Sequence, residues 1–269
     1  MLKATLLTLA AMLLSQDALA LDPGTTDPHA IMTAAEDRES NDNSQLRLSI
    51  TITDDKGRER SRQVQVKAMK FEQGNRQIVL FEKPADLAGA GLLSIDYTDG
   101  GVDDDQWLYL PSVGKTTRIA SADKSGSFMG TDLTYADMTR KDPDAYSYKM
   151  LEQSVDVDGT DCWHIEATPK TEKEQKETGY AKTEVWIAKD TLIPVQVKAW
   201  VIEGKRIKYT KLTDIRDVGG TAVAHTVTVR TTKGGEVEST SVLVTSNLMF
   251  NSADVTEADF TEQRLERGL

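Results

Sequence analysis

Alternation of apolar and polar residues is the feature that most constrains how this chain folds. Residues 46–52 alternate in this way, a polar turn follows at 54–57, and residues 63–68 alternate again. A period of two places successive side chains on opposite faces of a β-strand. The two segments and their turn therefore predict an antiparallel hairpin with one apolar face and one polar face.

The same pattern recurs along most of the chain. Further segments with strand character lie at 76–82, 92–97, 104–111, 146–153, 162–169, 180–188, 194–202, 206–218, 222–231 and 236–248. Glycine-containing turns separate many of them, and about twelve closely spaced strands are typical of a barrel or a wrapped antiparallel sheet. We expect a mostly β fold with short helices (α+β), in a single domain over residues 21–269.

Two of these strands are apolar on both faces. Residues 78–81 and 107–110 are apolar at both odd and even positions. A strand of this kind is covered on both sides. The sequence leaves open whether the cover is a ligand or a packed helix. Pro84, just after the first of these segments, predicts a short helix.

Several stretches depart from the alternating pattern. An Asp-Pro pair predicts a helix over 28–38, and residues 134–137 have the form of a capping box with Asp in place of Glu. The charged run 170–179 predicts an exposed hairpin loop. In the tail, Phe260 and Leu265 are the expected anchors on the sheet.

The first twenty residues have the form of a secretory signal peptide. Lys3 precedes an apolar run over 4–14, and small residues lead to Ala20, after which we expect cleavage. The run is shorter than the roughly twenty residues of a membrane-spanning helix. The one cysteine, Cys162, leaves no internal disulfide and no acylation site at the mature N-terminus. We predict a monomer exported to the periplasm and soluble there after cleavage.

The charge of the chain restricts its partners. A formal net charge of -11 at pH 7 argues against binding to nucleic acid and against spontaneous docking on anionic lipid. Both kinds of partner require clustered Lys and Arg side chains. The acidity is equally well explained by the need for solubility.

No catalytic or metal-binding constellation is present in the sequence. His29, His164 and His225 lie in separate segments without ligand spacing. Cys162 and His164 share one strand face but lack a third partner, and the acidic run 103–105 lacks the spacing of a calcium loop and predicts a solvated turn. There is no nucleophile elbow, phosphate-binding loop or dinucleotide fingerprint. We expect no enzyme, no catalytic residue, no metal and no cofactor.

Three ordered motifs within residues 81–137 resemble those of a known family. They are FEKPADLAG at 81–89, DDQWLYLP at 104–111, and RI at 118–119 followed by SGSFMGTDLTY at 125–135. Together they resemble the outer membrane lipoprotein-sorting protein family, the LolA-like relatives of the LolA and LolB lipoprotein carriers. The resemblance implies a curved antiparallel sheet that forms an unclosed β-barrel, with a helical lid over an apolar cavity for acyl chains.

The resemblance also implies a function and partners. It implies a periplasmic, non-enzymatic carrier that binds the acyl chains of a lipid or lipoprotein for transfer across the envelope. The implied partners are the acylated cargo, an inner-membrane transporter and an outer-membrane acceptor. Two alternatives stay open: a sensor of the RseB kind that regulates a membrane protein, and a scaffolding β module with a dry core.

The motifs and adjoining strands supply the candidate acyl cavity and lid. The candidate ligand-binding residues are Phe81, Leu93, Ile95, Trp107, Tyr109, Arg118, Phe128, Met129, Leu133 and Tyr135. Arg118 is a candidate for gripping a carbonyl or headgroup, since guanidinium is a multidentate donor, although an outward, solvated position is the alternative. Phe128 and Met129 interrupt a polar loop, and we hypothesise that they fill the empty cavity and are displaced by an acyl chain.

Overall fold

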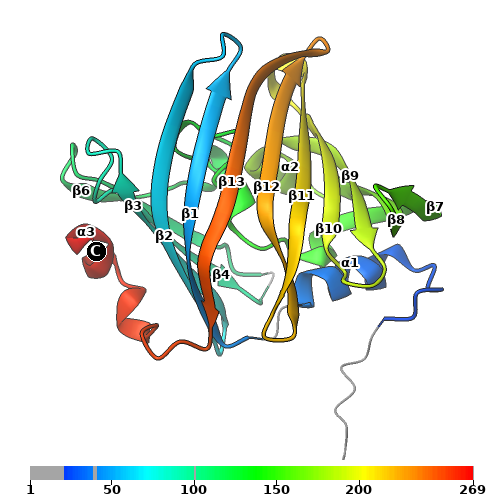
Figure 1. Ribbon diagram of the computed structural model, residues 1–269, viewed down its shortest axis with the longest axis horizontal. Helices are drawn as coiled ribbons and strands as arrows, with labels where there is room; N and C mark the ends of the chain where they lie inside the picture. The colour runs from blue at the N-terminus through cyan, green and yellow to red at the C-terminus, as the bar shows by residue number, and fades with distance from the viewer. Residues whose placement is uncertain (1–20, 39–40, 100, 269) are drawn as a thin grey trace, which may run out of the picture.

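A 13-stranded antiparallel sheet forms the body of the protein (Figure 1). The computed structural model describes residues 21–38, 41–99 and 101–268, so the predicted signal peptide, 1–20, lies outside the described residues. The strands are β1 (Asn43–Asp54), β2 (Glu59–Phe71), β3 (Gly74–Lys83), β4 (Gly91–Tyr97), β5 (Asp105–Leu110), β6 (Lys115–Arg118), β7 (Tyr146–Val157), β8 (Thr160–Pro169), β9 (Tyr180–Ala188), β10 (Pro194–Val201), β11 (Arg206–Val218), β12 (Thr221–Lys233) and β13 (Glu236–Phe250).

Short helices connect or cover the strands. The α-helices are α1 (Pro28–Asp37), α2 (Glu172–Thr178) and α3 (Glu262–Arg267). The 3₁₀ helices are η1 (Ser121–Asp123), η2 (Phe128–Gly130), η3 (Ala136–Met138), η4 (Pro143–Ala145), η5 (Glu203–Lys205) and η6 (Glu257–Asp259).

The sheet consists of antiparallel neighbours joined at one long-range seam. Its strand order is β6-β5-β4-β3-β2-β1-β13-β12-β11-β10-β9-β8-β7. Among the described strands, the pairing of β1 with β13 is the one that joins strands distant in sequence. β6 and β7 stand at opposite ends of this order, so the sheet is not closed, and it curves into a half-barrel (Figure 1). The predicted fold class is confirmed.

Helix α1 covers part of the concave face. Its N-cap Asp27 accepts hydrogen bonds from backbone N–H groups of the first turn, and Pro28 occupies the first helical position. Ile31 and Met32 are buried against β8 and β9, where they meet Trp163 and Ile187. The predicted helix over 28–38 is therefore confirmed within one residue, and its apolar stripe faces the sheet.

Strand β3 is apolar on both faces because a different segment covers each. Val79 and Phe81 pack on the concave side with residues of the segment 119–138. Ile78 and Leu80 pack on the convex side beneath the C-terminal tail. Both covers are parts of this chain, so the apolar character of β3 does not require a ligand.

The C-terminal tail is fastened to the convex face. Val255, Phe260 and Leu265 are buried in one cluster with β3 and β4. The predicted anchoring by Phe260 and Leu265 is confirmed. The Leu265 side chain lies against the backbone of β4, because a Cβ atom added at Gly91 would lie 2.7 Å from Leu265 Cδ1.

Three local predictions have different outcomes. The run 170–179 connects the antiparallel strands β8 and β9, as a hairpin connection does, but it contains the unpredicted helix α2. The N-cap Thr171 of α2 accepts a hydrogen bond from Glu174 N–H, and Gly179 ends the helix with a φ of 76°. Residues 84–89 form turns instead of a helix, because the Gly89 N–H already bonds back to β3. In the segment 134–137, the predicted capping box is present, with reciprocal bonds of 2.9 and 3.1 Å.

Replacing Leu265 by Ala tests the role of the tail. Leu265 is 0% exposed, so the truncation leaves a cavity on the convex face and should lower the free energy of unfolding by about 2–5 kcal/mol. Urea unfolding followed by circular dichroism measures this change. Glu262→Ala, at an exposed position of α3, is the matched control. Equal stabilities of the two variants would contradict a structural role for the tail.

Candidate functional site

The segment 119–138, called the inner segment below, occupies part of the concave face. Phe128 is 2% exposed, with its ring centroid 6.0 Å from that of Phe81 and 5.7 Å from that of Tyr135. Met129, Leu133 and Tyr135 pack around the same cluster. The aromatic and aliphatic side chains of the inner segment thus fill this part of the half-barrel.

Asp132 fastens the inner segment to β12 and β13. Its Oδ1 accepts hydrogen bonds from the hydroxyls of Thr231, at 2.5 Å, and Ser239. Its Oδ2 accepts from the hydroxyl of Ser241 at 2.6 Å, and its backbone N–H donates to the same hydroxyl oxygen at 2.9 Å. Hydrogen bonds to a buried carboxylate are stronger than those between neutral groups.

Further buried contacts hold the inner segment at other points. Arg62 Nη2 donates to the carbonyl oxygen of Met129 at 3.1 Å. The buried Lys124 forms an ion pair with Glu177 of α2. Any outward movement of Phe128 and Met129 would have to stretch or break such contacts, which cost free energy when left unmade.

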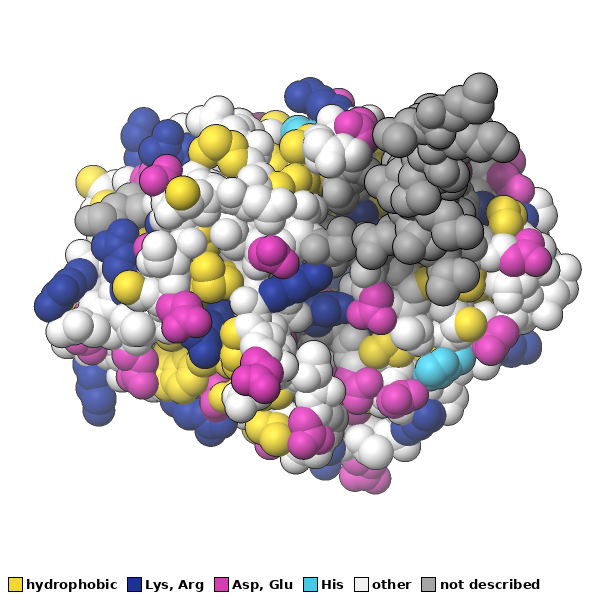
Figure 2. All heavy atoms as spheres, turned by 90° about the horizontal axis from the view of Figure 1, so that it is seen from below, with side chains coloured by type: hydrophobic (Ala, Val, Ile, Leu, Met, Phe, Trp, Pro, Cys, Tyr) yellow, Lys and Arg dark blue, Asp and Glu magenta, His cyan; other side chains and the backbone are white. Residues whose placement is uncertain are grey.

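A cavity of about 380 Å³ lies beside the inner segment, between α1 and the sheet. It sits at the end of the half-barrel where β1 begins and where β2 and β13 end, since Ser44, Met69 and Phe250 line it. In the view from below, Lys and Arg side chains are scattered over the face among Asp and Glu side chains, and some lie near its centre (Figure 2). Ligand pockets typically have volumes of about 300–1,000 Å³.

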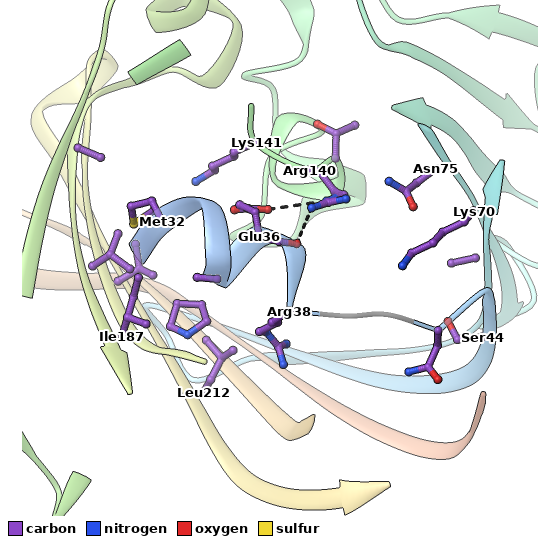
Figure 3. A pocket seen from close by; sticks show the side chains of 18 of the residues that line it. Met32, Glu36, Arg38, Ser44, Lys70, Asn75, Arg140, Lys141, Ile187 and Leu212 are labelled. Carbon is purple, nitrogen blue, oxygen red and sulfur yellow. Dashed lines mark hydrogen bonds and ion pairs between the residues drawn. The ribbon is translucent and has the colours of Figure 1, made fainter. Parts of the chain in front are cut away.

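One side of the cavity is apolar. Met32 of α1 and the strands β7 and β9–β11 form this wall, whose main residues are Met32, Tyr148, Val185, Ile187, Val197 and Leu212. Figure 3 shows Met32, Ile187 and Leu212 gathered on one side. These side chains offer hydrocarbon contact without any specific polar interaction.

The other side of the cavity is polar and rich in cations. It is lined by the cationic residues Arg38, Lys70, Arg140 and Lys141, the acidic residues Glu36 and Asp42, and the neutral residues Asn41, Asn43, Ser44 and Asn75. Figure 3 places Lys70, Asn75 and Ser44 on the side opposite Met32 and Ile187, with Arg38 and Arg140 between the two groups. The lining is therefore amphipathic along the length of the cavity.

Arg140 links this cavity to the end of α1. Its Nη2 donates to the carbonyl oxygen of Glu36 and, at 2.9 Å, to the carboxylate of Asp37. Burial raises the pKa of Glu36, opposed by the charges of Lys141 and Arg140. The backbone N–H of Arg140 donates to Asp96 Oδ2 at 3.3 Å, on the far side of the loop.

Asp96 lines a second, more acidic cavity. Burial, followed by repulsion from Asp104, raises the pKa of Asp96 to about 7. Its Oδ1 is buried and has no hydrogen-bond partner among the described residues. The ionised form of Asp96 is therefore disfavoured in the folded protein.

None of the ten candidate residues predicted from the sequence lines the cavity beside α1. Phe81, Phe128, Met129, Leu133 and Tyr135 lie together on the concave face in the cluster of the inner segment. Their assignment as a movable cover stays a prediction.

The remaining candidates lie elsewhere. Leu93, Trp107 and Tyr109 pack on the convex side under the tail, and Ile95 follows Leu93 on the same face of β4. Arg118 donates to Asp105 Oδ1 at 2.6 Å, and its side chain is 56% exposed. Sequence reasoning missed the lining residues of α1 and the 139–141 loop. The apolar stripe of α1 was the available signal, but it does not show which part of the sheet the helix covers.

The side chains considered for chemistry are held in structural roles. Cys162 is buried, and this burial raises the pKa of its thiol to about 11. His164 stacks on Trp186 at 4.0 Å and lies between Glu152 and Glu184. Within the described ranges, no group of three His, Cys, Asp or Glu side chains could hold a metal ion. No helix in the described part of the chain is long and apolar enough to cross a membrane.

Solved structures share this fold. A domain named for outer membrane lipoprotein sorting from Vibrio parahaemolyticus is 26% identical, with a TM-score of 0.79 over 89% of this chain and 98% of that chain. A DUF1329 family protein from Desulfovibrio piger gives 26% identity and a TM-score of 0.79 over 88% and 97%. A LolA superfamily protein from Nitrosomonas europaea is 17% identical, with a TM-score of 0.67 over 89% and 100%.

These similarities show that the protein has the LolA-like fold, which it shares with a domain named for outer membrane lipoprotein sorting, and the sequence motifs pointed to the same resemblance. A family model described as "Uncharacterized protein" matches residues 73–267, and the chain belongs to that family. A search of curated protein sequences found no match.

Replacing Asp132 by Ala tests how firmly the inner segment is held. Three hydroxyl groups lose their shared acceptor, so the free energy of unfolding should fall by about 2–4 kcal/mol. Amide hydrogen exchange should also quicken across the inner segment, including the N–H groups of Phe128 and Tyr135. Asp123→Ala, at an exposed position of the same segment, is the control. Unchanged exchange in the inner segment would contradict the fastening role of Asp132.

Replacing Asp96 by Asn tests the raised pKa. The folded state holds the Asp96 proton more tightly than the unfolded chain does, because the carboxyl pKa is about 4 in the unfolded chain and about 7 in the folded protein. The folded protein therefore loses stability as the pH rises from the lower of these values through the higher one. Asn cannot ionise. We expect the stability of the variant relative to the natural protein to be higher at pH 8 than at pH 5 in urea unfolding. Parallel pH profiles for Asp96→Asn and the natural protein would contradict the raised pKa of Asp96.

Proposed function

We propose that this protein is a non-enzymatic periplasmic carrier that holds an acyl chain of a lipid or lipoprotein in the cavity beside α1. The observation that carries the proposal is the cavity itself: about 380 Å³ with an apolar wall, inside a half-barrel of the LolA-like fold. The apolar wall would receive the hydrocarbon, and the polar side would face the rest of the cargo. Export to the periplasm is inferred from the signal-peptide form of residues 1–20.

Hydrocarbon burial alone supplies enough free energy for such a carrier. Each methylene removed from water contributes about 0.8 kcal/mol, so a chain of about fourteen carbons gains about 11 kcal/mol before the costs of ordering and association. A carrier therefore needs no catalytic group and few directed contacts. Release is the harder step, because the cargo must leave an apolar environment.

Helix α1 is the element best suited to control release. It contributes Met32, Ala35 and Glu36 to the cavity wall, and its C-terminal end is held by the contacts of Arg140. A small shift of α1 would open the wall while the buried polar contacts of the inner segment stay intact. The inner segment would then act as a fixed floor, and its displacement by the cargo is the alternative.

The partners of the proposed carrier are an inner-membrane transporter as donor and an outer-membrane acceptor. Both follow from the resemblance to lipoprotein-sorting proteins, which is supported by the domain from Vibrio parahaemolyticus. A regulatory protein that only senses acylated cargo would use the same cavity. Transfer of bound cargo from the protein to acceptor vesicles would favour a carrier over a sensor.

Filling the cavity tests the proposal. Leu212→Trp places a larger side chain in the apolar wall, and we expect it to weaken binding of a fluorescent fatty acid about tenfold or more, since the displaced methylenes each contribute to affinity. Ile215→Trp is the matched control, because Ile215 lies on the same strand, is 41% exposed and does not line the cavity.

The outcome that contradicts the proposal is equally specific. If the natural protein binds no fatty acid and yields no co-purifying lipid in native mass spectrometry, the cavity has another role. If binding occurs but Leu212→Trp and Ile215→Trp behave alike, the acyl chain lies elsewhere. Asp132→Ala then decides whether it lies under the inner segment, because a loosened segment would change the affinity.

A further inference from the structure

The cavity beside α1 has about the volume of one acyl chain. It measures about 380 Å³. A methylene group takes up about as much space as a water molecule in the liquid, about 30 Å³, so the cavity has room for one chain of about twelve carbons. Two such chains would need about twice this volume.

The core beneath α1 is already filled by the protein. Ile31, Trp163 and Ile165 are each 0% exposed. They pack in one cluster with Ile187, which also belongs to the apolar wall of the cavity. Protein interiors are packed as densely as organic crystals. A second chain would enter this region only by displacing side chains that stabilise the fold.

The inner segment fills the concave face beside the cavity. Phe128 and Ala136 of this segment are 2% and 8% exposed. Asp132 fastens the segment to β12 and β13 by accepting hydrogen bonds from Thr231 and Ser241. A second chain in this place would break buried hydrogen bonds and leave their polar groups without partners, which costs free energy.

A neighbouring cavity is unsuited to hydrocarbon because of its charges. Asn75, Arg140 and Lys141 line both cavities, so the two adjoin at the 139–141 loop. The second cavity is larger, at about 500 Å³, but eight of its lining residues are Asp or Glu and three are Lys or Arg. Hydrocarbon placed there would remove these charged groups from water, which is unfavourable.

We infer that this protein binds one acyl chain at a time, so that its cargo is an amphiphile with a single chain. This inference rests on the proposed function and specifies its ligand class. The chain lies along Met32, Ile187 and Leu212, which Figure 3 shows on one side of the cavity. A cargo with two or three chains would leave the others in water and would gain nothing from them.

Two lipids with the same phosphocholine headgroup test the inference. Lauroyl lysophosphatidylcholine has one longer chain, whereas dioctanoyl phosphatidylcholine has two shorter chains with more carbon in total. Both are titrated against the purified protein below their micellar concentrations, in competition with a fluorescent fatty acid. A site for one chain buries more carbon from the single-chain lipid. We expect this lipid to bind at least about tenfold tighter, since each buried methylene raises the affinity about fourfold. A site for two chains gives the opposite order.

A series of saturated fatty acids measures the size of the site. We expect the affinity to rise about fourfold with each methylene and to level off near about twelve carbons, because further carbons stay in water. Native mass spectrometry at saturating fatty acid should show a single bound molecule. An affinity that rises without levelling off as far as stearic acid would contradict the inferred size.

A bulky substitution in the apolar wall locates the chain. Val197→Phe should move the levelling point to chains shorter by about two carbons, because the added ring atoms occupy the space of about two methylenes. Val244→Phe makes the same change at a position that is 43% exposed and outside the cavity lining, and it should leave the levelling point unchanged. Thermal unfolding checks that both variants fold. Identical chain-length profiles for the two variants would overturn the assignment of the chain to this wall.

The outcomes separate this inference from the proposed function. If neither lipid binds and no fatty acid binds, the carrier proposal fails together with the inference. If the two-chain lipid binds tighter, or if two fatty acids bind to one protein molecule, the carrier proposal stands and the limit of one chain is overturned.

Discussion

The apolar concave face of an unclosed sheet is the constraint on which this structure depends. Thirteen strands curve into a half-barrel without meeting at their edges, so the inner side chains of β1–β3 and β8–β13 need other covers. Two segments of the chain supply them: the inner segment packs over Phe81, and α1 packs over Trp163 and Ile187. The two covers do not merge. The cavity lies between α1 and the sheet, beside the inner segment, and its apolar wall follows from the burial that stabilises the fold.

Polar contacts decide which cover is held more firmly. The inner segment is tied to the sheet by the carboxylate of Asp132 and to α2 by Lys124, both buried. Helix α1 depends more on its apolar stripe and on surface ion pairs such as that of Arg140 with Asp37. Exposed ion pairs contribute little free energy. The same sheet thus has one cover held by buried polar contacts and one held mainly by apolar packing, and this difference agrees with the proposed opening at α1.

The sequence was sufficient to predict the local secondary structure but not to predict which residues line the cavity beside α1. Period-two alternation predicted most strands, because it depends only on neighbouring residues, and the Asp27-Pro28 cap predicted α1. Because β5 is apolar on both faces, the sequence predicts that Trp107 and Tyr109 line the cavity. In the structure, the C-terminal tail with Phe260 covers the face on which these two side chains lie. No local pattern states which distant segment covers which face. The lining of the cavity joins α1, β2, β9–β11 and the 139–141 loop, and only the three-dimensional arrangement brings these together.

The seam between β1 and β13 has a consequence for how the protein is made. β1 pairs with β2 on one edge and with β13 on the other, and the register extends from Ser44 opposite Phe250 to Asp54 opposite Ser239. Until the last strand is available, one edge of β1 keeps unpaired hydrogen-bonding groups, which invite association with other chains. Contacts of such large sequence separation also slow folding. The half-barrel can therefore be completed only after nearly all of its residues have emerged from the ribosome. The interval before β13 pairs with β1 is when the chain most needs protection from aggregation.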